Sequence, residues 1–377
     1  MITKFFFILF TFFLFQTSSL LATEFSGTTF FSSVEWPKTD FSKHNVSFEE
    51  ILSGGPPKDG IPAIDDPVFL KSDQAQQWLD AFEPVISVEL SGIAKAYPLQ
   101  ILMFHEIVND EINGKPISVT FCPLCNTSIV FSRDVNGKRL DFGTTGRLRN
   151  SDLIMYDRQT ESWWQQFTGE AVIGFYTGVE LTEINSQIVS FENYQKRYPN
   201  GLVLSRKTGF NRQYGKNPYR GYDHINNVPF LMRGPVDGRL PAMERVISVK
   251  INDKRKLYPF SVLTQSAILN DNVSNSPLVI FKTGETYSVL DQNKITSSKK
   301  IPAYTVFSSL VENKALHFYF KNGLIRDRET NSQWDVMGQS THGKLKGQQL
   351  KTVQHGIHFA FAWLAFNPDV EIYTKNK

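Results

Sequence analysis

The sequence predicts a β-rich α+β protein built from two diverged tandem repeats of a mainly antiparallel β unit with a few short helices. Aromatic residues make up 13% of the 377 residues, and such side chains favour half-buried pleated sheets. Short runs of Val, Ile, Phe and Thr alternate with turn dipeptides such as Asn136-Gly137, which is typical of β-hairpins. Residues 85–102 also align without a gap on residues 246–263, with eight identical positions in eighteen.

The first 22 residues predict a secretory signal peptide. Lys4 supplies a positive charge, residues 5–15 are almost entirely apolar, and small residues follow near Ala22. No later stretch reaches the 18 consecutive apolar residues of a spanning helix, so we expect no membrane span in the mature chain. We therefore expect an exported protein, periplasmic or extracellular after cleavage near Ala22.

The overall charge helps to define the class of partner. The formal net charge is +3, and a chain so close to neutral gives no electrostatic reason to expect nucleic acid as a partner. We expect instead a small molecule or a metal ion as the ligand.

The organisation that follows the signal peptide is predicted from changes in composition. Residues 23–84 predict an extended leader that wraps the domain, because Gly and Pro recur throughout residues 54–67. Residues 85–208 and 246–377 predict the two β-rich repeats. Between them, residues 209–245 predict a connecting loop rich in Tyr, Arg, Gly and Pro. A loop of this composition is either a ligand-binding loop or a connector packed by its aromatic rings.

The two repeats can be compared with each other at the offset of 161 residues. Asn109-Asp110 falls on Asn270-Asp271, and the Tyr-Pro pair at 97–98 falls on the same pair at 258–259. In contrast, His105 falls on Ser266, and the two cysteines fall on Thr283 and Thr286. We expect a shared scaffold and a site in the first repeat only; ordinary divergence of one copy is the alternative.

The two cysteines of the chain predict the site. Cys122 and Cys125 lie between two strand-like runs, so they are expected at a tight turn and not at the start of a helix as in thioredoxin-like proteins. Two thiolates two residues apart suit zinc or copper, and His105 is the nearest upstream candidate for a third ligand. Glu106, Asp110 and Asn126 are expected to surround these ligands.

Other interpretations of these residues stay open. The cysteines could instead form a structural disulfide or a thiol-redox pair, or be inert thiols, with His105 as a hydrogen-bonded core residue. A second class of function is a binding module for a small anionic or carbohydrate ligand, held by Arg147, Arg149, Asp152, Arg212, Tyr214 and Tyr219. The arginines of the Gly143–Arg149 stretch could equally form ion pairs with nearby aspartates. His355 and His358 precede an apolar segment and are predicted to pack in the core.

Several separate motifs resemble the domain of unknown function 3179 family, and they occur in that family's order. They are Gly54-Gly-Pro-Pro-Lys-Asp-Gly-Ile-Pro62, His105-Glu-Ile-Val-Asn-Asp110, Cys122-Pro-Leu-Cys-Asn126, Leu148-Arg-Asn-Ser-Asp-Leu153, Met155-Tyr-Asp-Arg158, Trp164-Gln-Gln166 and Tyr214-Gly-Lys-Asn-Pro-Tyr219. The resemblance covers most of the mature chain and implies an exported prokaryotic protein. It implies no activity and no cofactor.

Overall fold

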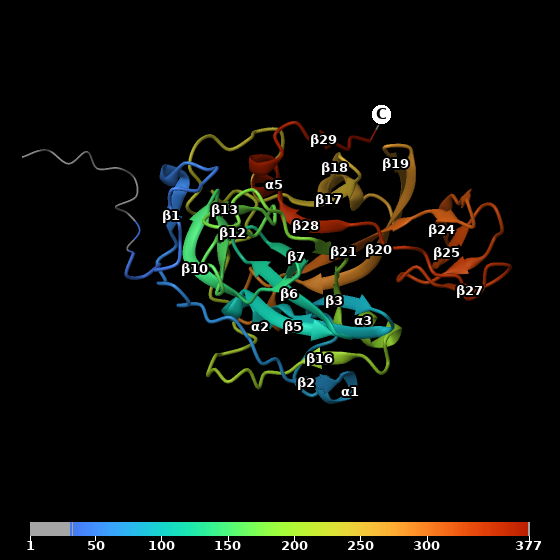
Figure 1. Ribbon diagram of the computed structural model, residues 1–377. Helices are drawn as coiled ribbons and strands as arrows, with labels where there is room; N and C mark the ends of the chain where they lie inside the picture. Colours follow the sequence, from blue (N-terminus) through green and yellow to red (C-terminus); the bar gives the residue numbers. More distant parts are fainter. Residues whose placement is uncertain (1–30, 32, 376–377) are drawn as a thin grey trace, which may run out of the picture.

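The computed structural model describes residues 31 and 33–375, so the expected signal peptide at residues 1–22 lies outside the described part of the chain (Figure 1). Short, mainly antiparallel sheets dominate, and none of the described α-helices exceeds seven residues. The predicted β-rich α+β class is confirmed. Among the described residues, no helix is long and apolar enough to cross a membrane.

The first unit follows a segment of four short elements. That segment contains η2 (Phe48–Glu50), β1 (Ile51–Ser53), β2 (Phe69–Lys71) and α1 (Ser72–Ala75). The unit itself consists of β3 (Pro84–Leu90), β4 (Ile93–Pro98), α2 (Leu99–His105), β5 (Ile107–Ile112), β6 (Lys115–Cys122), β7 (Thr127–Ser132), β8 (Asp134–Val135), β9 (Lys138–Arg139), β10 (Phe142–Arg149), β11 (Asp152–Asp157), β12 (Trp163–Gln165), β13 (Ala171–Ile173), β14 (Glu183–Ile184), β15 (Gln187–Ser190), α3 (Phe191–Arg197) and β16 (Leu202–Leu204).

The second unit has a similar series of elements. It consists of β17 (Arg245–Ile251), β18 (Lys254–Pro259), α4 (Phe260–Leu263), β19 (Ile268–Val273), β20 (Ser276–Tyr287), η3 (Ile295–Ser297), β21 (Lys300–Ser308), β22 (Leu310–Val311), β23 (Lys314–Ala315), β24 (Phe318–Lys321), β25 (Leu324–Asp327), β26 (Gln333–Trp334), β27 (Ser340–His342), β28 (His355–Phe359), α5 (Ala360–Phe366) and β29 (Glu371–Ile372).

Strand pairing agrees between the two units. In the first, β3 pairs antiparallel with β4 and β15, and β4 pairs parallel with β16. In the second, β17 pairs antiparallel with β18 and β28, and β18 pairs parallel with β29. The registers also match, since Val85 lies opposite Pro98 and Val246 lies opposite Pro259. The shared order and pairing are consistent with a duplication, which stays a prediction.

Two-residue turns fix several of the hairpins. Asn113-Gly114 joins β5 to β6 with φ values of 50° and 76°, and Asn322-Gly323 joins β24 to β25 with 53° and 78°. A left-handed conformation at both turn residues matches the right-handed twist of the flanking strands. Asn and Gly adopt it at low cost, which explains why these dipeptides punctuate the sequence.

The polar residues common to both units stabilise the scaffold. The Asp110 carboxylate accepts hydrogen bonds from Lys95 Nζ at 2.8 Å and from Tyr97 Oη at 2.6 Å, all in the buried interior. In the second unit Asp271 has an ion pair with Lys256 Nζ at 2.9 Å and accepts a hydrogen bond from Tyr258 Oη at 2.8 Å. The repeated Tyr-Pro and Asn-Asp pairs therefore belong to strand-to-strand networks, as the comparison of repeats indicates.

The segments outside the units extend the first unit. β1 adds to the edge of β10, and β2 adds to β16. Trp36 is only 1% exposed and packs edge-on against Trp163. Residues 209–244 contain neither helix nor strand. The expected boundaries of leader, repeats and loop stay predictions.

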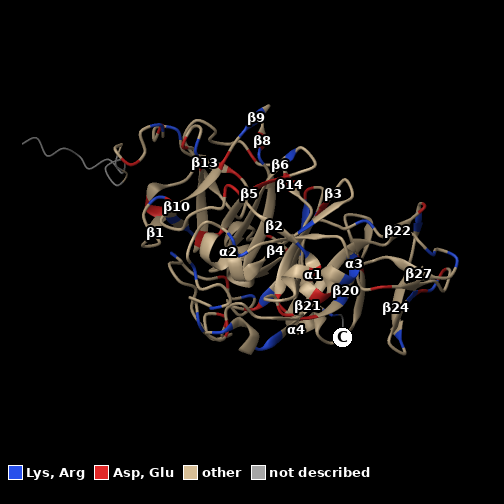
Figure 2. Ribbon diagram, turned by 90° about the horizontal axis from the view of Figure 1, so that it is seen from below, with Lys and Arg blue, Asp and Glu red and all other residues tan. Residues whose placement is uncertain are grey.

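One hydrophobic core joins the two units. A single cluster contains Val119 and Phe121 from β6 together with Phe359 and Trp363 from the end of the second unit. In Figure 1, β7 and β28 lie side by side near the centre, while the β10–β13 and β24–β27 sheets lie at opposite ends. Figure 2 shows basic and acidic residues interspersed over the view from below.

A buried carboxyl group before β3 makes the stability depend on pH. Glu83 is 2% exposed and accepts hydrogen bonds from Gln100 Nε2 at 2.5 Å and from the Asp80 backbone N–H at 3.2 Å. Burial raises the pKa of Glu83 from 4.5 to about 7. The folded state therefore holds a proton that the unfolded chain releases. The resulting stabilisation is complete below about pH 4.5 and is lost as the pH rises through about 7.

We predict that Glu83→Gln removes this contribution. The difference in unfolding free energy between wild type and variant should fall by about 2–3 kcal/mol from pH 5 to pH 8, as the linkage relation requires. Urea denaturation at both pH values measures it. Glu89→Gln, at an exposed position of β3, is the matched control and should show no such difference. If the unfolding free energy of the wild type changed with pH in parallel with that of Glu83→Gln, the prediction would be contradicted.

Candidate metal centre

The two cysteines lie at a tight turn between two strands, as predicted. β6 ends at Cys122 and β7 begins at Thr127. Asn126 closes the turn with φ 51°, and its backbone N–H donates to Pro123 O at 3.2 Å. Cys122 is 2% and Cys125 0% exposed, and both are free thiols. The left-handed residue lets the chain reverse while both sulfurs point to the same side.

A carboxylate from another hairpin completes the group. Cys122, Cys125 and Asp152 place their ligand atoms within 4.8 Å of one another. Asp152 is the first residue of β11 and follows the two-residue turn Asn150-Ser151, whose φ values are 51° and 65°. The backbone carbonyl of Ser151 accepts from Cys125 Sγ at 3.4 Å. We call these three residues the donor group.

The two oxygens of Asp152 differ in their surroundings. Oδ2 accepts hydrogen bonds from Gln165 Nε2 at 2.6 Å and from the Phe167 backbone N–H at 2.9 Å, which fix the carboxylate. Oδ1 is buried and has no hydrogen-bond partner among the described residues. An orphaned buried oxygen is costly, and here it lies on a group that is otherwise suited to hold a cation.

Electrostatics in the donor group favour protons or a cation. Burial is the main cause that raises the pKa of both thiols, with further contributions from the nearby Asp152 charge. Burial likewise raises the pKa of Asp152 to about 7 and that of Glu106 to about 8, the latter also because of the Asp152 charge. None of the described Lys, Arg or His side chains forms an ion pair with Asp152 or Glu106. Four acidic groups therefore share one buried region without a basic partner.

His105, predicted as the third ligand, does not lie in the group that the two cysteines form with Asp152. Its Nδ1 lies 2.7 Å from the Pro62 carbonyl and its Nε2 lies 2.7 Å from Tyr214 Oη. Because a carbonyl only accepts, Nδ1 carries the proton and Nε2 accepts from the tyrosine. Both nitrogens of this buried ring are thus occupied, and burial lowers its pKa. This is the hydrogen-bonded core position that the alternative interpretation described.

The next residue, Glu106, has different surroundings from those of His105. It ends α2 with φ 58°, a conformation that an L side chain adopts at a cost. Glu106 is 7% exposed and lines a cavity of about 680 Å³, which we call the large cavity. Asp110, expected near the cysteines, is engaged by Lys95 and Tyr97 instead.

The residues predicted to bind a ligand do not all lie at one site. Arg147 and Tyr219 both line the large cavity. Arg149 forms an ion pair with Glu50 at 2.7 Å, and exposed Arg212 lines a different cavity. The alternative of ion pairs with nearby aspartates is not found for Arg147 or Arg149 among the described residues, because Arg147 pairs with Glu35 and Arg149 with Glu50. Asp152, predicted for this set, belongs to the donor group.

Two tyrosines of the connecting segment lie next to the donor group. Burial raises the pKa of Tyr222 to about 12, and the charges of Cys125 and Cys122 contribute. Burial, with the charges of Glu106 and Cys122, also raises that of Tyr219. Both rings line the large cavity. The cavity and the donor group are therefore neighbours, although neither sulfur lines the cavity wall.

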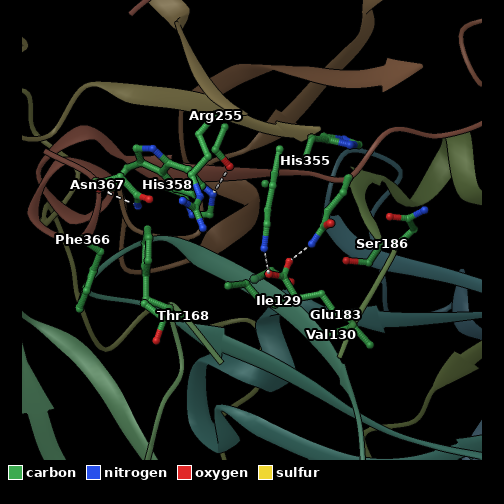
Figure 3. Close-up of a pocket in the computed structure, with 18 of the residues that line it drawn as sticks. Ile129, Val130, Thr168, Glu183, Ser186, Arg255, His355, His358, Phe366 and Asn367 are labelled. Carbon is green, nitrogen blue, oxygen red and sulfur yellow. Dashed lines mark hydrogen bonds and ion pairs between the residues drawn. The ribbon is translucent and has the colours of Figure 1, made fainter. Parts of the chain in front are cut away.

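The second unit holds the cysteine turn in place. The Phe359 backbone N–H donates to Cys125 O at 2.9 Å, and Thr127 Oγ1 donates to the same oxygen at 3.2 Å. His358 Nδ1 lies 2.9 Å from Thr127 Oγ1, and its Nε2 lies 2.8 Å from Ser248 Oγ. Figure 3 shows His358 in the cavity of about 250 Å³ between the units.

The donor and acceptor in each of these hydrogen bonds follow from the number of protons that each group can donate. The Thr127 hydroxyl uses its one proton on Cys125 O, so it accepts from His358 Nδ1–H. His358 Nε2 then accepts from Ser248 Oγ–H. Burial lowers the pKa of His358 to about 3, so the ring is neutral at physiological pH. Ser248, His358 and Thr127 form a fixed hydrogen-bond chain that ends on the cysteine turn.

Sequence reasoning missed Asp152 as a partner of the thiols and His358 as a support of the turn. A difference in length between the corresponding hairpins of the two units could have indicated Asp152. Phe142 pairs with Asp157 as Phe318 pairs with Asp327, but β10 has eight residues and β24 has four. The first unit's hairpin is longer, and Asp152 lies in the extension. The support by His358 has no comparable local signal.

These features define an α+β protein in which two β-rich units share a core and the first contains a buried thiol–carboxylate donor group. The chain belongs to the family described as "Protein of unknown function (DUF3179)", which matches residues 58–370. No curated protein and no solved structure matches the chain.

We predict that Thr127→Val destabilises the protein by about 1–3 kcal/mol. The change removes a donor to Cys125 O and leaves His358 Nδ1–H unpaired in the interior, and an orphaned buried group costs this much. Urea denaturation measures the loss. Thr182→Val, at an exposed position, is the matched control and should stay within about 0.5 kcal/mol of wild type. A ¹⁵N spectrum in which His358 carries its proton on Nε2 would contradict the assigned direction of the chain.

Proposed function

We propose that the protein binds one thiophilic metal ion, zinc or copper, through Cys122, Cys125 and Asp152. The observation that carries the proposal is the convergence of two buried sulfurs and an oxygen of the Asp152 carboxylate within 4.8 Å. A cation would balance the negative charge that otherwise requires protons on these groups. The proposal keeps the two cysteines expected from the sequence and exchanges His105 for Asp152.

Zinc is the better match to this set of ligands. Zinc accepts thiolate and carboxylate together, and three protein ligands leave a fourth position open. Copper(I) is satisfied by the soft sulfurs alone, so Asp152 would contribute little to its affinity. The effect of an Asp152 substitution therefore separates the two metals.

A thiol-redox role receives less support. Reactive cysteines have lowered pKa values because of a nearby cation or a helix N-terminus. Here burial raises the pKa of both thiols, and Cys125 is followed by a turn and β7. Such thiols are poor nucleophiles at neutral pH, whereas a metal ion can still displace their protons.

We predict about one zinc per chain in protein purified under reducing conditions, measured by elemental analysis. Zinc titration against a competing chelator should show an affinity loss of at least about tenfold in Cys122→Ser, Cys125→Ser and Asp152→Asn, because each removes an ionised ligand. Calorimetry in buffers of different ionisation enthalpy should show release of between about two and three protons per zinc at pH 7, since both thiols and part of the Asp152 population are protonated.

Matched controls come from the second unit and from His105. Thr283→Ser and Thr286→Ser alter the positions that align with the cysteines and should keep full zinc affinity. His105→Gln should also keep it, because that ring is bonded elsewhere. An Asp152→Asn variant that loses zinc but retains copper(I) would support the assigned donor set. Absence of metal and of micromolar zinc affinity in reduced wild-type protein would overturn the proposal.

A further inference from the structure

The large cavity has walls from three parts of the chain. Residues 54–61 of the leader form one side, β10 and β11 form another, and residues 218–231 of the connecting segment close it. Most of the lining side chains are apolar, among them Leu124, Leu148 and Phe230. A cavity of about 680 Å³ lies within the size range of sites for small organic molecules, which are mainly apolar with a few convergent polar groups.

Glu106 is the first polar group in this cavity. Glu106 is 7% exposed and lines the cavity, and its side chain makes no hydrogen bond with any described residue. Only its backbone is engaged, through Glu106 N–H to Leu102 O and Phe121 N–H to Glu106 O. The left-handed backbone, φ 58°, adds strain that Gly or Asn would relieve. A strained, buried and unpartnered acid in a cavity indicates that the ligand supplies the missing partner.

Arg147 is the second polar group. Its side chain is 24% exposed, forms a long ion pair with Glu35 at 4.0 Å, and places its guanidinium over the Phe31 ring at 5.7 Å. Among the described residues no acceptor forms a hydrogen bond with its side-chain N–H groups. Neighbouring Arg149 contrasts with it, because that side chain donates to Glu50 at 2.7 Å and does not line the cavity. Arg147 therefore lines the cavity with side-chain N–H groups that its long ion pair with Glu35 leaves without a hydrogen bond, and such groups can hold a carboxylate.

We propose that the large cavity binds an organic acid with an apolar body, whose carboxylate pairs with Arg147 and accepts a hydrogen bond from the carboxyl group of Glu106. The apolar walls take the body of the ligand. Charge complementarity favours an anion over a cation, because Arg147 and Arg220 both line the cavity, and Glu106 is buried without a basic partner among the described residues, which favours its protonated form. A sugar would leave its hydroxyl groups against apolar walls.

The first test compares ligands of one size on the metal-free wild-type protein by isothermal titration calorimetry at pH 7. Octanoate should bind at least about tenfold more tightly than 1-octanol and than octylamine, because only the acid pairs with Arg147. Among straight-chain carboxylates, affinity should rise about fourfold with each added methylene until the cavity is filled. Removing the metal excludes coordination of the carboxylate at the donor group, so the result is independent of the proposed metal site.

The second test uses variants. Arg147→Gln should weaken octanoate binding by about tenfold or more, while the matched control Arg149→Gln should leave it unchanged. Glu106→Gln retains a hydrogen-bond donor and should keep octanoate affinity within about threefold, whereas Glu106→Ala should weaken it. Because the first test needs no variant, a failure of these proteins to fold does not prevent a decision.

Three outcomes would overturn the proposal. One is equal affinity for octanoate, 1-octanol and octylamine, which would mean that the polar groups select nothing. Another is preferential binding of octylamine that Glu106→Gln abolishes, which would mean that the cavity takes a cation. The third is absence of octanoate binding at millimolar concentration. Each is distinguishable from a failure of the metal proposal, because zinc binding is measured separately.

Discussion

Burying acidic groups without a basic partner is expensive, and the first unit brings four of them together. Burial raises the pKa of Cys122, Cys125, Asp152 and Glu106, and the charge of Asp152 raises further the pKa of both thiols and of Glu106. Each lies where the chain reverses or a helix ends. The cysteines lie at the β6–β7 turn, Asp152 follows the β10–β11 turn, and Glu106 follows the end of α2. Protons or a cation must compensate, and both proposals follow from this constraint.

The second unit contributes support without contributing a donor. It has threonines where the first unit has cysteines, and its β24–β25 hairpin is shorter than the one that presents Asp152. Yet its strand β28 donates to Cys125 O, and His358 anchors Thr127. Such external bonds hold the cysteine turn in one position, and a turn held in this way would need less ordering if it bound a metal ion.

Glu106 connects the donor group with the large cavity. Its charge contributes to the raised pKa of Cys122 on one side, and its carboxyl group lines the cavity on the other. Tyr219 and Tyr222 lie at the same boundary and come from the connecting segment. The segment predicted as either a ligand-binding loop or a connector therefore forms a wall of the cavity next to the donor group. A ligand in the cavity and a metal at the donor group would be neighbours, and occupancy of one would alter the charge that the other experiences.

The sequence alone determined the β-rich class, the hairpins and the cysteine turn. These depend on local chemistry: β-branched and aromatic runs form strands, Asn-Gly pairs accept left-handed turns, and the residues after Cys125 disfavour a helix. The aligned repeats likewise indicated which polar residues belong to the scaffold, as the networks of Asp110 and Asp271 illustrate.

The tertiary structure determines which residue lies beside the two cysteines and which partners the other candidate residues have. Asp152 reaches the thiols only because a separate hairpin packs against the β6–β7 turn, a contact that no spacing encodes. His105 and Glu106 are adjacent in the chain, yet the left-handed backbone at Glu106 sends one side chain toward Pro62 and the other into the cavity. Arg147 and Arg149 also differ, since Arg149 donates to Glu50 at 2.7 Å whereas the ion pair of Arg147 with Glu35 is longer, at 4.0 Å. Sequence fixes which groups are available, whereas long-range packing determines which of them remain unpartnered.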